Sequence, residues 1–213
     1  MQPKLARGGI VVIDPKSANL LRVIALQYNP ESVSRSLQIQ AVGPDGDRLE
    51  ALRLKGPPNE TIKVDIALDA ADQLEFPEKH VTTTQFGIFP ELAALETLVY
   101  PTTAALNAAT SSTAAGSLEI APAESPLAMF VWSRSRVVPV RVIEFNITEE
   151  LFDTSLNPIR AKVSLGMRVL SLNDLGVNHR GANLFMAYLA NKERFARLAG
   201  SAPITSLGIT GIG

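Results

Sequence analysis

The feature that most constrains the fold of this chain is the strict alternation of apolar and polar residues over residues 159–169. Apolar side chains stand at every second position, namely Ile159, Ala161, Val163, Leu165, Met167 and Val169. Between them stand Arg160, Lys162, Ser164, Gly166 and Arg168. A period of two residues places successive side chains on opposite faces of a β-strand. We therefore predict a long strand with one buried face and one basic face in contact with water.

The same alternation recurs elsewhere and predicts a sheet-rich fold. Residues 33–41 and 62–68 repeat it, so each run predicts a further strand. In residues 137–147 the apolar phase changes between Val142 and Ile143, which predicts a β-bulge or a bend such as a barrel corner. Pro139 lies in this run and has no N–H to donate, which predicts an edge strand or a strand start there.

Two segments have the pattern of helices. The first begins near Pro90 and ends at Leu98, ahead of Pro101. The second covers residues 183–199, where large apolar residues recur at helical spacing. We predict a mainly β fold of the α+β class with these two helices. In this prediction residues 1–175 form the β domain, residues 176–200 form a helical extension, and residues 201–213 form a flexible tail. Within the β domain, residues 101–126 are rich in Ala, Thr and Ser and form a flexible loop.

Composition excludes most reaction chemistry. The 213 residues contain no cysteine and only two histidines, His80 and His179, which excludes thiol catalysis and cysteine-ligated metals. No phosphate-binding loop or dinucleotide fingerprint is present, so we expect no cofactor. With 20 Lys and Arg against 21 Asp and Glu, binding of nucleic acid through net charge is not expected.

The membrane signals are weak. The apolar run at residues 10–13 is too short for a signal peptide or a membrane helix, and no other run approaches the roughly 20 residues that a span requires. We expect a soluble chain that folds in the cytoplasm and does not insert into a membrane.

Three groups of residues have competing structural and functional interpretations. Trp132 is the only tryptophan, and core packing is favoured over a carbohydrate platform. The acidic group Glu149, Glu150 and Asp153 fits neither a glycosidase pair nor a calcium loop, so a polar turn between strands is favoured. The face that carries Arg160, Lys162 and Arg168 is either ordinary solvated surface or faces an acidic neighbouring subunit.

Three blocks of sequence resemble the tube-protein-like baseplate components of contractile injection systems. The first is Leu26-Gln27-Tyr28-Asn29-Pro30-Glu31-Ser32-Val33, and the second is Gly56-Pro57-Pro58 with the strand that follows. The third joins Phe130-Val131-Trp132, Val138-Pro139-Val140-Arg141-Val142, Thr148-Glu149-Glu150-Leu151-Phe152-Asp153 and Leu156-Asn157-Pro158-Ile159-Arg160-Ala161-Lys162-Val163. With the sequence around these blocks, the resemblance covers about residues 10–172.

The resemblance implies a fold and a set of partners. It implies a phage-tail-tube-like antiparallel β-barrel or sandwich with a flanking helix and a C-terminal helix. It also implies a homohexameric ring that contacts a spike or hub protein, the inner tube protein and neighbouring baseplate proteins. The structural and interface residues that it suggests are Tyr28, Asn29, Pro30, Trp132, Glu149, Glu150, Phe152, Asn157, Pro158, Arg160, Lys162 and Arg168. Many relatives carry a C-terminal LysM module, which residues 200–213 are too few to form.

We therefore expect a non-enzymatic adaptor that joins a trimeric spike hub to a sixfold inner tube and templates tube assembly. It would assemble in the cytoplasm into a large contractile particle. Its long chain and added C-terminal helix favour the adaptor over the bulk inner-tube subunit. A free-standing β-sandwich module that binds glycan or peptide is the alternative from another class, and an enzyme of unrecognised type is a third.

Overall fold

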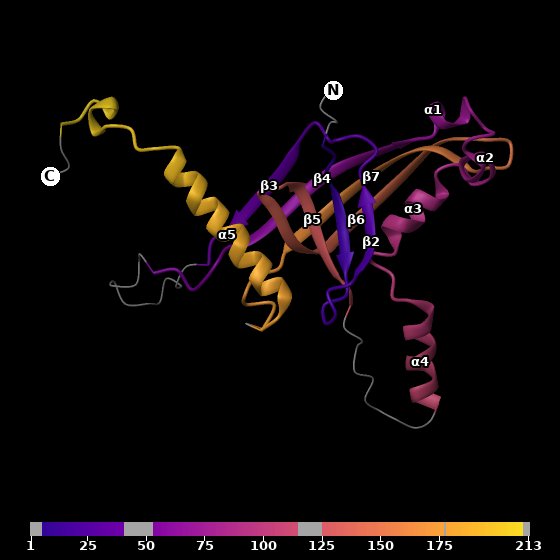
Figure 1. Ribbon diagram of the computed structural model, residues 1–213, viewed down its shortest axis with the longest axis horizontal. Helices are drawn as coiled ribbons and strands as arrows, with labels where there is room; N and C mark the ends of the chain where they lie inside the picture. The colour runs from indigo at the N-terminus through magenta and orange to yellow at the C-terminus, as the bar shows by residue number, and fades with distance from the viewer. Residues whose placement is uncertain (1–5, 41–52, 115–124, 177, 211–213) are drawn as a thin grey trace.

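The structure is a computed structural model that describes residues 6–40, 53–114, 125–176 and 178–210 (Figure 1). Its strands are β1 (Gly9–Ile13), β2 (Leu20–Ala25), β3 (Val33–Gln38), β4 (Asn59–Asp69), β5 (Leu127–Ser133), β6 (Arg136–Phe152) and β7 (Pro158–Val169). Its helices are α1 (Ala71–Leu74), α2 (Val81–Phe86), α3 (Phe89–Glu96), α4 (Thr103–Ala114), α5 (Arg180–Leu198) and the short 3₁₀ turn η2 (Ile204–Leu207).

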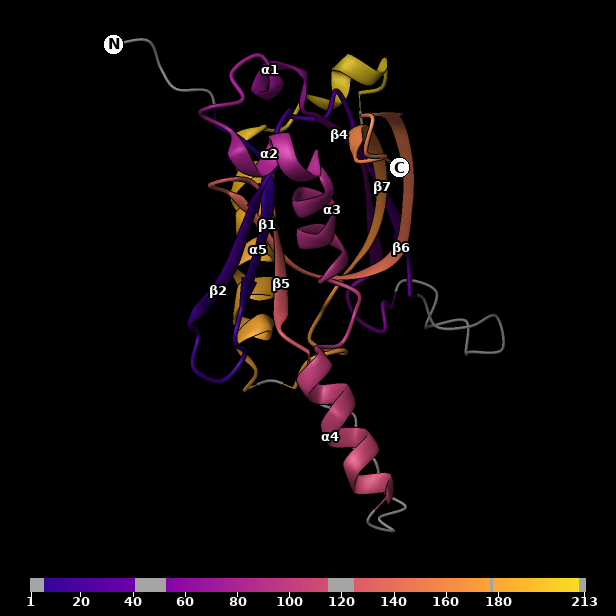
Figure 2. The ribbon, with the colours of Figure 1, turned by 90° about the vertical axis from the view of Figure 1, so that its right-hand side faces the viewer.

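The seven strands form one antiparallel sheet in the order β2-β1-β5-β6-β7-β4-β3. The predicted α+β class is therefore confirmed. Barrel closure is not observed in the part of the chain that the structure describes, because β2 and β3 are edge strands and do not pair with each other. Helix α3 lies between the β2 side and the β4 side of the curved sheet, which keeps the two sides apart (Figure 2).

The predicted strands are present, with one correction. Residues 159–169 lie in β7, and the predicted phase change in β6 is a register shift between Val142 and Glu144, where β6 carries an extra residue opposite β7. Pro139 does not lie in an edge strand, because β6 is flanked by β5 and β7. It lies close to the start of β6, opposite Met129, where its missing N–H interrupts the sheet least.

The core lies on the concave side of the sheet. Every second residue of β4 and β7 is buried there, beside residues from β5, β6 and two helices. The largest fully buried side chains are Phe130, Ile10, Ile62, Ile66, Leu92, Leu95, Leu165 and Met167. Leu92 and Leu95 come from α3, and α5 adds the buried rings of Phe185 and Tyr188. Burial of one such side chain contributes about 2 kcal/mol.

The helices differ in number from the prediction. Helices α3 and α5 match the two predicted segments within a few residues. The described chain contains five α-helices rather than two, and residues 103–114 of the predicted loop form α4. Alanine has the highest intrinsic helix propensity, so an Ala-rich segment can be helical without burying a large apolar face. Helix α4 extends away from the sheet, and Leu106 on it is 51% exposed (Figures 1 and 2).

Gly87 permits the close contact between α2 and the β6–β7 turn. It ends α2 with a φ of +59°, a region that side-chain-bearing residues rarely adopt. A Cβ there would also collide with the carbonyl oxygen of Pro158, which accepts a hydrogen bond from the Ile88 N–H at 2.9 Å. Gly87 thus lies in close contact with Pro158, the first residue of β7.

We predict that Gly87→Ala lowers the free energy of unfolding by about 3 kcal/mol, because it combines a left-handed backbone with a clash against a fixed carbonyl. Gly200→Ala is the control, since Gly200 has a φ of +71° but open space around it. That variant should lose only about 1 kcal/mol. Urea denaturation followed by circular dichroism measures both, and equal losses would show that the α2–β7 contact does not constrain position 87.

Candidate assembly surfaces

The two edge strands expose apolar side chains. On β2, Leu20, Leu21 and Val23 are 53–62% exposed. On and after β3, Leu37 is 47% and Ile39 is 74% exposed. Each edge strand pairs with a single neighbour among the described residues, so its outer backbone groups have no partner strand there. Exposed edges with apolar side chains are prone to pair with another chain.

The convex side of β4, β7 and β6 carries a set of internally paired charges that we call the paired polar face. Its ion pairs are Lys63–Glu144 at 2.7 Å, Lys162–Glu150 at 2.8 Å and Arg160–Asp69 at 2.7 Å, and the Ser164 hydroxyl donates to Asp65 at 2.6 Å. These groups are partly exposed, so salt screens them and they add little to stability. Because the charges pair with one another, this face is hydrated and its net charge is close to zero.

Gly166 shapes the middle of this face. It pairs with Lys63 on β4 and with Glu144 on β6, and it has no side chain between them. A Cβ at Gly166 would lie 2.8 Å from the Cβ of Glu144. The missing side chain therefore lets Lys63 and Glu144 meet across the middle strand, and their ion pair lowers the pKa of Glu144.

The basic residues of β7 have acidic partners within the chain. Lys162 pairs with Glu150, Arg160 with Asp69, and Arg168 with Asp174. Pairing with the acidic residues of a neighbouring copy stays a prediction, and it would have to replace these intrachain pairs. Glu149 and Glu150 lie within β6 rather than in a turn, which corrects that part of the expectation.

The β6–β7 turn is held by a compact hydrogen-bond network. The Asp153 carboxylate accepts hydrogen bonds from the Asn157 side chain and from the backbone N–H groups of Asn157 and Ser155. These bonds lower the pKa of Asp153, and Asn157 also donates to the Gln85 carbonyl in α2. Phe152 pairs across the turn with Pro158 and is half exposed. Asn157 and Pro158 therefore attach the turn to α2, and Phe152 lies exposed beside them.

Gly8 brings two of the resembling blocks together. Its N–H donates to the Asn29 side chain at 2.9 Å, and the ring of Trp132 lies over its backbone. Trp132 is partly buried and stacks on Phe130, so the prediction of core packing is confirmed. Tyr28 and Pro30 flank Asn29, and Tyr28 is 46% exposed. Through these contacts of Gly8, β5 is connected to the segment between β2 and β3.

A buried carboxylate anchors α5 to the sheet, and the sequence analysis missed it. Glu60 is 3% exposed and accepts hydrogen bonds from Arg35 at 2.6 Å, Tyr188 at 2.9 Å and Lys192 at 2.9 Å. The Lys192 ammonium also lies over the Tyr188 ring. We call these four residues the Glu60 cluster. The sequence does contain a sign of this cluster. Glu60 and Arg35 stand at positions of two adjacent strands where the alternation places apolar residues.

Burial by itself raises the pKa of Glu60, but the hydrogen bonds from Lys192, Tyr188 and Arg35 outweigh that effect and lower it. Burial and the adjacent Glu60 carboxylate raise the pKa of Tyr188. The tyrosine thus remains a hydrogen-bond donor, and Glu60 remains a carboxylate at neutral pH. The cluster joins β3, β4 and α5 through charge-assisted hydrogen bonds.

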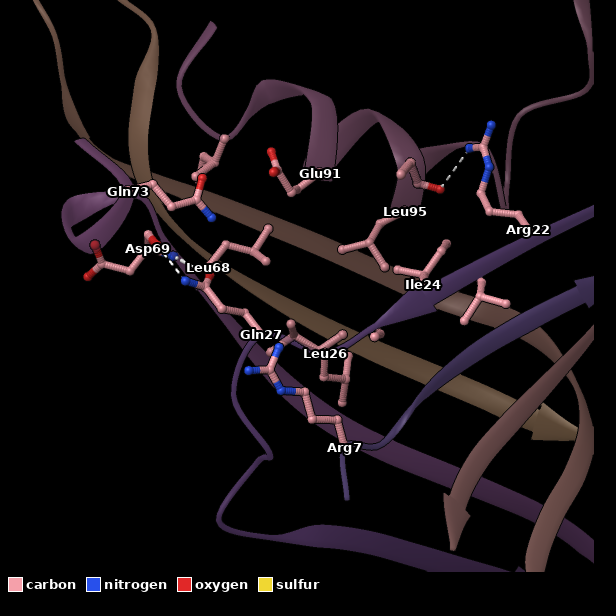
Figure 3. Close-up of a pocket in the computed structure, with 15 residues that line it drawn as sticks. Arg7, Arg22, Ile24, Leu26, Gln27, Leu68, Asp69, Gln73, Glu91 and Leu95 are labelled. Atoms are coloured by element: carbon pink, nitrogen blue, oxygen red, sulfur yellow. Dashed lines mark hydrogen bonds between the residues drawn. The ribbon is translucent and has the colours of Figure 1, made fainter. Parts of the chain in front are cut away.

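A cavity of about 320 Å³ lies between β2, β4 and α3 (Figure 3). Leu26, Leu68 and Leu95 form part of its apolar wall, and Arg22 donates to the Ala94 carbonyl and the Thr97 hydroxyl at one end. At the other end the Gln27 amide donates to the Asp69 carbonyl and accepts from the Asp69 N–H. The cavity thus occupies the gap that the unclosed sheet leaves.

The chemistry-bearing residues are dispersed. His179 caps α5 by accepting a hydrogen bond from the Gly181 N–H at 3.1 Å, and His80 precedes α2. In the described ranges, no three His, Asp or Glu side chains are close enough to hold a metal ion. None of the helices seen there is long and apolar enough to cross a membrane.

Comparison with protein-family models finds no match for this sequence, and comparison with curated proteins finds none either.

We predict that Glu60→Gln lowers the free energy of unfolding at neutral pH by about 2 kcal/mol, because Arg35 and Lys192 lose their anion at a partly buried site. The folded-state pKa of Glu60 lies below its ordinary value of 4.5, so its stabilisation is present above that pH and is lost as pH falls through the folded value. The variant should therefore lose stability less steeply than the wild type in acid. Urea denaturation over a pH series measures this, and Glu144→Gln, at an exposed pair, is the matched control. Equal effects of the two variants would contradict the prediction.

Proposed function

We propose that this protein is a structural baseplate subunit of a contractile injection system. In this proposal it forms a hexameric ring that joins the trimeric spike hub to the inner tube and starts tube assembly. The observation that carries the proposal is the open antiparallel sheet, whose two terminal strands, β2 and β3, both present apolar side chains. The sequence resemblance to tube-type baseplate components supports it independently.

The edge strands β2 and β3 suit a ring because they lie at opposite ends of the sheet and present different surfaces. Contact between β2 of one copy and β3 of the next is a head-to-tail interface, and repeated rotation about one axis closes it into a ring. Closure pairs the free backbone groups of both edges and covers Leu21, Val23 and Leu37. A closed ring therefore removes the aggregation hazard that each isolated chain carries.

The paired polar face fits the inside of such a ring. A lumen that passes cargo needs a hydrated wall without large unpaired charge, and the ion pairs of β4, β6 and β7 provide one. The opposite face is covered by α3 and α5, so the sheet has one side available for water and one for the core. Ring assembly requires no reactive group, which agrees with a non-enzymatic role.

Helices α4 and α5 support the adaptor over the bulk tube subunit in this proposal. Helix α4 projects from the body, and the chain beyond α5 extends outward on another side (Figure 1). Such projections can contact neighbouring baseplate parts, whereas they would obstruct the stacking of identical rings along a tube. In this proposal α5 and the chain after it dock onto neighbouring baseplate parts, in place of the C-terminal LysM module that many of the proteins it resembles carry.

A free-standing binding module is the second candidate, and the cavity between β2, β4 and α3 favours it. Its volume of about 320 Å³ and its apolar wall fall within the range of small-ligand pockets. This alternative predicts a stable monomer with affinity for a ligand. It leaves the exposed edges of β2 and β3 without a role.

The test is to tag the chain in its native host, sediment large particles and locate the label by electron microscopy. The adaptor predicts label at one end of sheathed tubes. Label along the whole tube would assign the bulk tube subunit, and protein that stays entirely soluble would favour the binding module.

The same experiment with Leu21→Lys and Val23→Lys combined tests the role of the β2 edge. Both side chains are more than half exposed, so the chain should fold normally, as circular dichroism can verify. Charge on the edge should nevertheless block strand pairing and remove the label from particles. Val81→Lys at the start of α2, where the side chain is 56% exposed, should leave incorporation unchanged. Incorporation of the double variant at the wild-type level would exclude β2 from the interface.

A further inference from the structure

A second cavity, of about 490 Å³, lies where α5 crosses the β5–β6 turn and β3. Its polar lining consists of Arg35, Arg136, Lys192, Ser133, Ser135 and Asn191. Tyr188, Phe195 and Ala196 of α5 complete the wall. The cavity lies beside the Glu60 cluster and on a different part of the molecule from the gap between β2 and α3.

The cavity has an excess of positive charge. Arg35, Arg136 and Lys192 line it, and Glu60 is the carboxylate that pairs with two of them. One Glu60 oxygen accepts from Arg35 and Tyr188, and the other accepts from Lys192. The Arg136 side chain makes no ion pair or hydrogen bond within the described residues, and its charge lies near enough to Tyr188 to lower the pKa of that tyrosine slightly against the raising effect of burial and Glu60. Three cations thus face the charge of a single, already bonded carboxylate.

The remaining polar groups can donate hydrogen bonds into the cavity. The Ser133 and Ser135 hydroxyls lie 3.4 Å apart at its rim, and Asn191 contributes an amide. Lys192 and Arg35 use only some of their N–H groups on Glu60 and Tyr188, and their side chains are 36% and 27% exposed. Convergent N–H and O–H donors with net positive charge are the features that bind an oxyanion.

The wall on the other side is apolar. Phe195 is 47% exposed and lines the cavity together with Ala196, and the Arg194 guanidinium lies 4.5 Å from the centre of its ring. A carboxylate on a methylene stem can place its oxygens among the cations and its stem against the ring, as long charged side chains do at protein surfaces. The volume is also large enough for a side chain with part of its backbone.

We propose that this cavity binds a glutamate or aspartate side chain from an acidic segment of a protein partner. Arg136 provides a cation whose side chain has no ion-pair partner among the described residues. Lys192 and Arg35 add donors, and Phe195 contacts the stem. This inference goes beyond ring formation, because it concerns a separate surface and requires only the isolated full-length chain. Helix α5 would then hold a partner as well as cover the sheet.

The test is fluorescence anisotropy of a fluorescein-labelled hexaglutamate peptide at low ionic strength, titrated with the full-length chain. We expect saturable binding that Arg136→Gln weakens by about tenfold, the effect of losing a charge-assisted hydrogen bond. Arg134→Gln is the matched control, because Arg134 lies in the β5–β6 turn close to Arg136 and is exposed but does not line the cavity. It should change the affinity by less than about twofold, since an exposed charge is screened.

Three outcomes would overturn the proposal. They are no peptide binding at millimolar protein, equal weakening by Arg136→Gln and Arg134→Gln, and binding of inorganic phosphate without binding of the peptide. Equal weakening would indicate general attraction to a basic surface, and phosphate binding alone would assign a free ion as the ligand. Neither variant removes a side-chain hydrogen bond or ion pair seen within the described residues, so a folding defect should not obscure the result; circular dichroism verifies this.

Discussion

The register in which β4, β7 and β6 pair is the constraint on which the rest of the structure depends. It aligns Val64, Leu165 and Phe145 toward the core and sets Lys63, Gly166 and Glu144 in a row on the convex side. Because side chains alternate, a slip by one residue would bury the charges and expose the apolar set. The buried face and the paired polar face are therefore consequences of the same register.

Local sequence pattern predicts the strands, and the remaining structure depends on contacts between distant residues. The alternation of β7, the bulge in β6 and the helices α3 and α5 follow from residue spacing. The contribution of α5 to the Glu60 cluster does not, since Tyr188 and Glu60 are 128 positions apart. Strand order and the open edges are likewise set by tertiary packing. Helix α4 was missed because its apolar pattern is weak and only its alanine content favours a helix.

The contacts that stabilise the monomer differ from the surfaces that remain available for assembly. Packing beneath the sheet holds α3 in place, and the Glu60 cluster, which includes Arg35 of β3, holds α5. Neither contact uses the outer backbone edge of β2 or β3. Lys63, Arg160 and Lys162 on the convex side form ion pairs with Glu144, Asp69 and Glu150 of the same sheet. The proposed ring then uses strand edges that the monomer does not need for its core. The excess cations near α5 give a distinct partner a separate point of attachment.

Cysteine cross-linking tests the proposed head-to-tail interface most directly, because the sequence contains no cysteine of its own. Val23→Cys and Ser36→Cys place one thiol on the convex side of each edge strand. In extracts of the native host, a short bismaleimide should convert the tagged double variant into a ladder of covalent oligomers that ends at the hexamer. Each single variant should give no such ladder. A double variant that stays monomeric, in extracts where the wild-type particles are present, would contradict the ring.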